Sequence, residues 1–238
     1  MLRPLALITL FLLALAAPAA AQTHGGAEAG GGAVAPTGGQ VATVTDGRIT
    51  VSAKSDAVLG KVVRFRGHVP TSDAGRTITI ERFDDRAGEW VAEAAAVVKS
   101  DGAFVARWRT DHIGRFRLRA TIEDGAAARA SQASPELSLT VYKPAKATWY
   151  GPGFYGRTTA CGQTMTRRLV GVAHRTLPCG TKVAVMYKSR VMTVPVVDRG
   201  PFRNGADWDL TYAAATALEF RHTDVIGAVR LRERAPAR

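Results

Sequence analysis

Residues 103–122, AFVARWRTDHIGRFRLRATI, contain two segments of alternating apolar and polar side chains, separated by a turn-forming stretch. Such alternation indicates half-buried strands, because successive side chains of a strand point to opposite faces of the sheet. Similar segments lie to either side: ITVSA (49–53), VVRFRGHV (62–69), TITIERF (77–83), WVAEAAAVV (90–98) and LSLTVY (137–142). About seven short strands with regular turns predict an antiparallel β-sandwich over residues 48–142.

In its strand pattern, this first domain resembles a bacterial immunoglobulin-like domain, which implies a spacer or adhesion module. We expect Trp90, Trp108 and Phe116 in its core, with stacking on sugars as the alternative. His68 and His112 are isolated in the sequence, so no catalytic cluster is expected in this domain.

The amino-terminal segment has the pattern of a secretory signal peptide. Arg3 precedes the apolar run of residues 5–17, and the small residues Ala19 to Ala21 follow at a cleavage position, which predicts a signal peptide over residues 1–21. The run is short for a membrane span, so export is favoured over a transmembrane anchor. Residues 22–47 are rich in Gly and Ala and are expected to form a flexible tether.

The chain is strongly basic, with a formal net charge of +12. Scattered arginines in an exported protein favour a polyanionic cell envelope over nucleic acid as the partner. The alternative, that the basic composition only keeps the protein soluble, remains open. The predicted location is therefore outside the cytoplasmic membrane, secreted or in the cell envelope.

The sequence pattern changes after a short linker, KPAK (143–146). This change predicts a second domain over residues 147–235. The stretch WDLTYAAATALEF (208–220) has helical spacing, and Asp209 at its start is a candidate helix cap. The stretch VVDRGPF (196–202) reads as a strand that ends on Asp198 and Arg199 before a Gly-Pro turn. Asp198 is therefore a candidate for a turn residue or for a site carboxylate.

The chain has two cysteines, Cys161 and Cys179. In an oxidising compartment an isolated pair indicates one disulfide. No second pair and no nearby histidine cluster completes four ligands, so no metal site is expected.

The second domain resembles the rare lipoprotein A (RlpA)-like family. The resemblance covers residues 147–231 and is carried by TWYGPGFYGRTTACGQTM (148–165), VGVAHRTLPCGTKVAV (170–185), VVDRGPF (196–202) and WDLTYAAATAL (208–218). It implies a six-stranded double-psi β-barrel. Family members with established activity are lytic transglycosylases that act on peptidoglycan glycan strands, and other members are known only as wall-binding proteins.

The resemblance also suggests roles for individual residues. Asp198 matches the family's functional aspartate and is expected to act as the proton donor, with His174 beside it and Asp209 as a second carboxylate. Residues expected to contact the glycan are Tyr150, Thr159, Gln163 and Arg199. Gln163 stands where members with known cleavage often carry a glutamate, and an amide cannot ionise. A Cys161–Cys179 bridge would join two site-forming loops.

Three functional hypotheses follow from the sequence. The leading hypothesis is an endolytic peptidoglycan transglycosylase that produces 1,6-anhydromuramyl ends without a cofactor or metal. The rival is a non-catalytic, expansin-like wall-binding protein, which Gln163 favours. A secreted inhibitor or effector is a third and more distant hypothesis, because fold alone does not assign function. We expect a monomer with peptidoglycan glycan strands as its partner and no nucleic acid.

Overall fold

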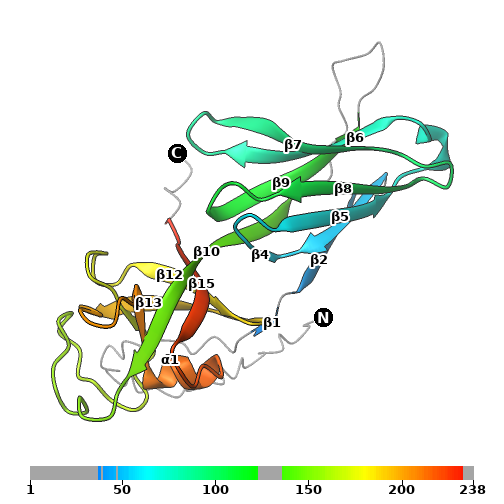
Figure 1. The fold of residues 1–238 in the computed structure, drawn as a ribbon. Helices are drawn as coiled ribbons and strands as arrows, with labels where there is room; N and C mark the ends of the chain where they lie inside the picture. The colour runs from blue at the N-terminus through cyan, green and yellow to red at the C-terminus, as the bar shows by residue number, and fades with distance from the viewer. Residues whose placement is uncertain (1–36, 39, 47, 123–135, 233–238) are drawn as a thin grey trace, which may run out of the picture. The chain divides into compact units, whose positions relative to one another are not determined.

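The computed structural model describes residues 37–38, 40–46, 48–122 and 136–232 (Figure 1). The predicted signal peptide and most of the predicted tether lie outside the described residues. The described part of the chain is almost entirely β, with one short α-helix. The predicted fold class, all-β with a closed six-stranded barrel and a short helix, is confirmed.

Two antiparallel sheets form the first domain. One sheet has the order β2 (Val41–Asp46), β3 (Ile49–Lys54), β5 (Val62–His68) and β8 (Ala103–Arg109). The other contains β7 (Glu89–Val97), β6 (Thr77–Asp84), β9 (Gly114–Ile122) and the first part of β10 (Leu137–Tyr150), which also pairs in parallel with β4 (Asp56–Val58). The short 3₁₀ helix η1 (Thr71–Asp73) precedes β6.

The two sheets share one hydrophobic core. Phe65 and Phe104 of the first sheet are buried in the same cluster as Ile80, Leu118 and Leu139 of the second. The architecture is therefore a β-sandwich, as the alternating segments predict, and each of the seven segments forms a strand. The finer assignment to an immunoglobulin-like domain stays a prediction.

Two predicted boundaries differ from the structure. Residues 41–46 of the predicted tether form β2, because the segment is rich in β-branched residues and pairs with β3 along its whole length. The predicted linker of residues 143–146 lies within β10, where Lys143 pairs with Ala228 and Lys146 with Val225. Strand β10 thus runs without interruption from the sandwich sheet into the second domain (Figure 1).

The aromatic residues of the sandwich divide into two groups. Trp108 is buried in the core and Phe116 packs against it edge to face, with ring centroids 6.3 Å apart, as expected. Trp90 was expected in the core, but it lies outside the core cluster and is only partly buried. Its ring packs against Phe83 at 5.2 Å and beneath the Arg119 guanidinium at 4.3 Å.

A pair of like charges faces solvent on the first sheet. Arg64 of β5 lies directly opposite Arg107 of β8, and both side chains are exposed. Like charges in a cross-strand pair are destabilising. Replacing Arg107 with glutamate should therefore raise the free energy of unfolding by about 0.5 kcal/mol.

Chemical denaturation measures this effect. In the double variant Arg64→Glu/Arg107→Glu the pair is again of like charge, so the gain should disappear. A gain that persists in the double variant would assign the effect to net charge and not to the pair.

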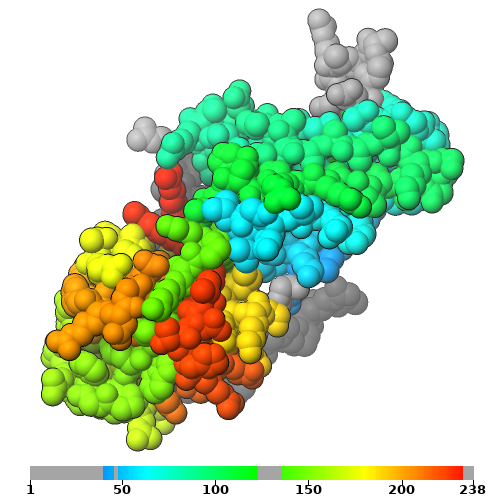
Figure 2. All heavy atoms as spheres, in the orientation of Figure 1, coloured from blue at the N-terminus to red at the C-terminus, as the bar shows by residue number. Residues whose placement is uncertain are grey.

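Six strands close into a barrel in the second domain. The ring runs β10, β14 (Trp208–Thr211), β11 (Val172–Ala173), β13 (Arg190–Asp198), β12 (Lys182–Tyr187) and β15 (Asp224–Arg230), which returns to β10. The short β1 (Thr37–Gly38) pairs with β13 outside this ring. The space-filling view shows the sandwich mainly in cyan to green and the barrel mainly in yellow-green to red (Figure 2).

The barrel interior is filled by alternate residues of its strands. In β13, Met192, Val194 and Val196 are buried in the core cluster, together with Trp208 and Leu210 of β14. This pattern decides which side chains are left to line the outer surface of the barrel.

The helix of this domain is shorter than the sequence predicts. Trp208–Thr211 is a strand, and α1 spans only Tyr212–Ala217. The expectation that Asp209 caps the helix is wrong, since the Thr211 hydroxyl is the cap and accepts a hydrogen bond from the Ala214 amide. Asp209 is therefore free for another role.

Candidate active site

A β-bulge places two aspartates on the same face of the barrel. Val172 of β11 pairs with Val196, but the next residue, Ala173, pairs with Asp198, so β13 contains one extra residue at this point. Without the bulge, Asp198 would follow Val194 and Val196 into the interior, because side chains alternate along a strand. Bulges commonly redirect a side chain in this way beside functional sites.

The bulge completes a row of side chains across four strands. Ala173 pairs with Asp198 on one side and with Asp209 on the other, and Asp209 in turn pairs with Thr148 of β10. The two aspartates thus lie two strands apart, with Cα atoms on the order of 10 Å from each other. The small side chain of Ala173 between them leaves the space open.

Asp198 is held by three hydrogen bonds. Its Oδ1 accepts from the backbone amides of Ala160 and Arg199, each at 2.8 Å. Its Oδ2 accepts from the Tyr150 hydroxyl at 3.2 Å. In all three hydrogen bonds Asp198 is the acceptor, so its carboxyl group is held in place by donors on both oxygens.

Asp209 is held differently. It accepts one hydrogen bond, from the Thr148 hydroxyl to Oδ1 at 2.8 Å. Burial, with a smaller contribution from the negative charge of Asp198, raises the pKa of Asp209 to about 6, against the weaker opposing effect of the Thr148 hydrogen bond. Asp209 is thus the carboxyl that can hold a proton near neutral pH.

Tyr150 donates a hydrogen bond to Asp198 and also senses the charge of Asp209. Its pKa lies well above the ordinary value, because the ring is largely buried and the phenol faces the charge of Asp198, with a further contribution from Asp209. The phenol therefore stays protonated and acts as a fixed donor to Asp198.

These residues line a cleft with a volume of about 820 Å³, within the range of roughly 300–1,000 Å³ typical of ligand sites. Two phenyl rings at its edge are unusually exposed, Phe154 at 48% and Phe202 at 76%. Three cationic side chains also line it, namely Arg157, Arg199 and Arg203. A rim of exposed aromatic rings and arginines suits a polar ligand with apolar faces and acidic groups.

The loop that carries Phe202 is fixed at both ends. The Arg175 guanidinium donates to the carbonyl oxygens of Pro201 and Ala206, each at 2.9 Å. The Lys146 ammonium donates to the Asn204 carbonyl oxygen at 2.9 Å. Gly200 begins the loop with a φ of +123°, a conformation that side chains rarely permit. The exposed phenyl ring thus sits on a held loop.

His174 does not line the cleft, in contrast to the expectation from the sequence. Its Nδ1 accepts hydrogen bonds from the amides of Thr176 and Leu177, and its ring packs on Trp208 at 4.5 Å. Burial, followed by the nearby positive charge of Arg175, lowers its pKa. The physical reason is alternation, since His174 follows Ala173 and turns to the opposite side of the strand.

The His174 backbone still supports the site. Its amide donates to the Asp198 carbonyl oxygen at 3.2 Å, which braces the end of β13. Of the residues expected in the site, the cleft brings together Tyr150, Asp198, Arg199 and Asp209.

Thr159 and Gln163 do not line the cleft either. The buried Thr159 hydroxyl accepts from the Gln163 amide at 3.2 Å, and the Gln163 side chain is exposed. Both residues belong to the turn whose Ala160 amide binds Asp198. Their place in the structure is to shape this turn.

Several residues that line the cleft were not predicted from the sequence, namely Thr148, Phe154, Arg157, Phe202, Arg203 and His222. The signal for two of them was present, because a phenylalanine in a glycine-rich or Gly-Pro loop has no strand or helix face to bury it. Thr148 gave no such signal, since its hydrogen bond to Asp209 depends on strand register.

The predicted disulfide between Cys161 and Cys179 is present, with Cα atoms 5.6 Å apart. Cys161 follows directly after Ala160, so the bridge ties the Asp198-binding turn to the loop before β12. The expectation that the bridge joins two site-forming loops holds for the turn that binds Asp198.

Removing the disulfide should destabilise the protein and loosen the site. The double variant Cys161→Ser/Cys179→Ser is expected to lose about 3 kcal/mol of unfolding free energy in thermal or chemical denaturation. Full stability after both replacements would show that packing alone holds this turn.

Among the described residues, no group of three or more His, Cys, Asp or Glu side chains is arranged to bind a metal ion. The same part of the chain contains no helix with the length and apolar character needed to span a bilayer.

The site thus belongs to a closed β-barrel domain with paired carboxyl groups in an external cleft. Residues 143–230 match a family described as lytic transglycolase. This segment is similar to the domain of that family, and the resemblance stated from the sequence is confirmed.

The curated relatives are peptidoglycan enzymes. A probable endolytic peptidoglycan transglycosylase RlpA from Synechocystis is 44% identical over 87 residues, which cover 36% of this chain and 27% of the relative. The endolytic peptidoglycan transglycosylase RlpA of Campylobacter jejuni is 44% identical over 75 residues, which cover 31% of this chain and 27% of the relative. This chain therefore spans about a quarter of the length of these relatives.

Among solved structures, a Streptomyces papain inhibitor is similar, with 28% identity and a TM-score of 0.28. The similarity covers 36% of this chain and 92% of the inhibitor.

Proposed function

We propose that this protein is an exported cell-wall enzyme that cleaves the glycan strands of peptidoglycan by lytic transglycosylation. The observation that carries the proposal is the pairing in one cleft of a proton-holding carboxyl, Asp209, with a carboxylate fixed by hydrogen bonds, Asp198. The family of the barrel and the peptidoglycan transglycosylases among its relatives support the choice of reaction.

The two carboxyl groups have different roles in the reaction, one as proton donor and one as proton acceptor. Asp209 donates its proton to the glycosidic oxygen as the bond from that oxygen to C1 breaks. The 6-hydroxyl oxygen of the same muramic acid bonds to C1, and Asp198 accepts the proton of that hydroxyl. One carbon–oxygen bond breaks and one forms, so no water is consumed. Asp198 then releases its proton to solvent and Asp209 regains one, which returns both groups to their starting states. The product carries a 1,6-anhydro ring.

This assignment reverses the role expected for Asp198 from the sequence. Asp198 already accepts hydrogen bonds from two backbone amides and from the Tyr150 hydroxyl, so both of its oxygens are arranged as acceptors. Asp209 is the better donor because burial favours its neutral form. A proton donor is most effective when its pKa lies near the working pH, and a value of about 6 meets that condition.

The rim of the cleft supports an acidic glycan as substrate. The exposed rings of Phe154 and Phe202 offer flat apolar surfaces to the C–H faces of sugars. Arg157, Arg199 and Arg203 offer positive charge to the carboxyl groups that muramic acid exposes in peptide-free strands. The proposed location, outside the cytoplasmic membrane, follows from this substrate.

A non-catalytic wall-binding protein is the second candidate function. It is favoured by Gln163, which stands where cleaving members of the family often carry a glutamate. The two candidates differ in whether products form.

The experiment is digestion of purified peptidoglycan and of peptide-free glycan strands, followed by mass spectrometry. Cleavage predicts 1,6-anhydromuramyl ends that accumulate with time. Sedimentation of the protein with the wall in the absence of such ends would select the binding function. Reducing ends without the anhydro ring would indicate hydrolysis and contradict the proposed chemistry.

A further inference from the structure

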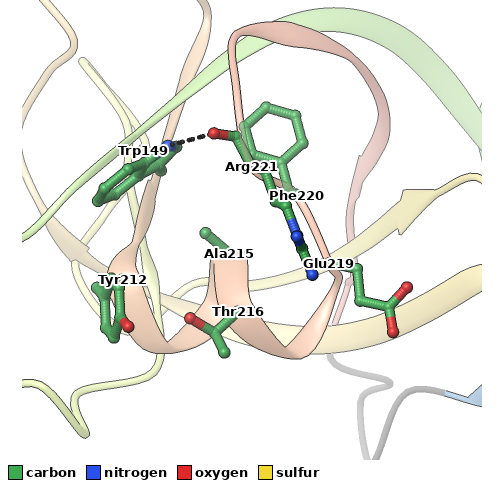
Figure 3. Close-up of a pocket in the computed structure, with 7 residues that line it drawn as sticks. All are labelled: Trp149, Tyr212, Ala215, Thr216, Glu219, Phe220 and Arg221. Carbon is green, nitrogen blue, oxygen red and sulfur yellow. Dashed lines mark hydrogen bonds between the residues drawn. The ribbon is translucent and has the colours of Figure 1, made fainter.

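A second hollow lies beside the cleft and shares one wall with it. It has a volume of about 280 Å³, and Trp149 lines both cavities. The remaining walls come from helix α1 and the loop that follows it, including Tyr212, Ala215 and Phe220 (Figure 3). Apart from Trp149, no residue that lines the cleft lines this hollow.

The shared indole is fixed in place. Its Nε1–H donates to the Arg221 carbonyl oxygen at 3.2 Å, as the dashed line in Figure 3 shows. The ring also packs against Tyr212, with centroids 5.9 Å apart and a tilt of 58°. The loop that holds the indole continues to His222 and Thr223, which line the cleft. Trp149 and this loop therefore form a single ridge with a hollow on either side.

The hollow combines an apolar interior with exposed polar groups at its edge. Ala215 and Phe220 are buried beneath it, and Tyr212 is partly exposed at its side. The Thr216 hydroxyl and the Arg221 guanidinium make no hydrogen bond to other described residues, and both side chains are exposed. Ligand pockets typically have this composition, with apolar walls and a few polar groups that fix orientation.

We propose that this hollow is a second glycan subsite, which binds one N-acetylated sugar of the strand whose cleavage point lies in the cleft. A linear glycan that leaves the cleft across Trp149 meets the hollow next. The sugar face packs on the aromatic wall, and its acetamido methyl enters the apolar interior. The volume lies just below the range of roughly 300–1,000 Å³ for whole ligands, so it suits a single sugar unit.

The inference rests on the proposed function for the identity of the ligand. Because it concerns binding, its test does not depend on whether the bond is cut. The subsite predicts that affinity rises with chain length once a fragment is long enough to extend past Trp149. Burial of an acetamido methyl and part of one sugar face corresponds to about a tenfold gain in affinity.

Calorimetry with peptide-free glycan fragments of increasing length tests the inference. Thr216→Trp fills the hollow without touching Asp198 or Asp209, and Val225→Trp is the control, since Val225 is exposed on the barrel and lines neither cavity. We expect Thr216→Trp to remove the roughly tenfold gain for long fragments and to leave short fragments unaffected. Equal affinities of the two variants for long fragments would overturn the subsite.

Methyl NMR of the unaltered protein provides a second measurement that needs no variant. The methyl groups of Ala215 and Thr216 line only the hollow, so long fragments should shift their signals and short fragments should not. Absence of a length-dependent shift contradicts the inference, and so does a shift produced by stem peptide alone. Binding with this length dependence but without anhydro products would retain the subsite and reject the proposed cleavage.

Discussion

Replacing Asp209 with asparagine is expected to lower the rate of glycan cleavage by about 10²–10⁴-fold, because the variant has no proton to donate to the leaving oxygen. The amide oxygen can still accept the Thr148 hydrogen bond, so the shape of the cleft should persist. Time-resolved product analysis measures the loss. Asp207→Asn is the matched control, since Asp207 is exposed, lies two residues earlier and does not line the cleft.

The same variant should be more stable than the wild type at about pH 8. Burial raises the pKa of Asp209 from 3.8 to about 6, so the folded state binds this proton more tightly than the unfolded state. The contribution of Asp209 to the free energy of unfolding therefore falls as the pH rises from about 4 to about 6, and does not recover at higher pH. After allowance for screening by solvent, the asparagine variant should gain about 1–2 kcal/mol at high pH.

The gain should vanish near pH 4, where Asp209 of the wild type is already protonated. Denaturation of both proteins at the two pH values tests the sign. A variant that is less stable than the wild type at high pH would show that the Asp209 carboxylate stabilises the fold, contrary to the burial argument. Loss of activity with a gain of stability is typical of residues kept for function.

Replacing Asp198 with asparagine should reduce cleavage by about 10²–10³-fold, because the neutral amide cannot accept the proton of the attacking hydroxyl. The side-chain amide oxygen can still accept hydrogen bonds from the backbone amides of Ala160 and Arg199, so folding should be little changed. Binding of glycan fragments should also be largely retained. A variant with full activity would remove Asp198 from the mechanism.

Asp198→Asn also carries a test of coupling. The charge of Asp198 contributes to the raised pKa of Asp209, although burial is the larger cause. The loss of Asp198's charge should therefore lower the pKa of Asp209, but not fully to 3.8, because burial remains. The midpoint of the pH–activity profile of the variant should fall below that of the wild type by the same amount. An unchanged midpoint of the pH–activity profile would mean that the charge of Asp198 does not affect the pKa of Asp209.

The parts of this structure that depend on local pattern could be predicted from the sequence. Alternation in residues 103–122 and in the similar segments identified the strands of the sandwich, since a half-buried strand requires that pattern. The stretch VVDRGPF correctly placed Asp198 at the end of a strand. The paired cysteines correctly indicated a disulfide.

The parts that depend on register could not be predicted. Helical spacing in WDLTYAAATALEF suggested that Asp209 begins a helix, but pairing with Thr148 and Ala173 draws this segment into a strand. The bulge opposite Ala173 decides that Asp198 lies on the same face as Asp209, while alternation after Ala173 turns His174 away from the cleft. A single extra residue in one strand reverses such assignments, and no local signal in the sequence marks it.

The central claim is that Asp209 holds the transferable proton beside the hydrogen-bonded carboxyl group of Asp198. Carbon-13 NMR of the aspartate side-chain carboxyl groups, followed as a function of pH in the full protein, tests this claim most directly. The signal of Asp209, assigned by its loss in Asp209→Asn, is predicted to titrate with a pKa of about 6. Titration of Asp209 near the ordinary value of 3.8 would contradict the account.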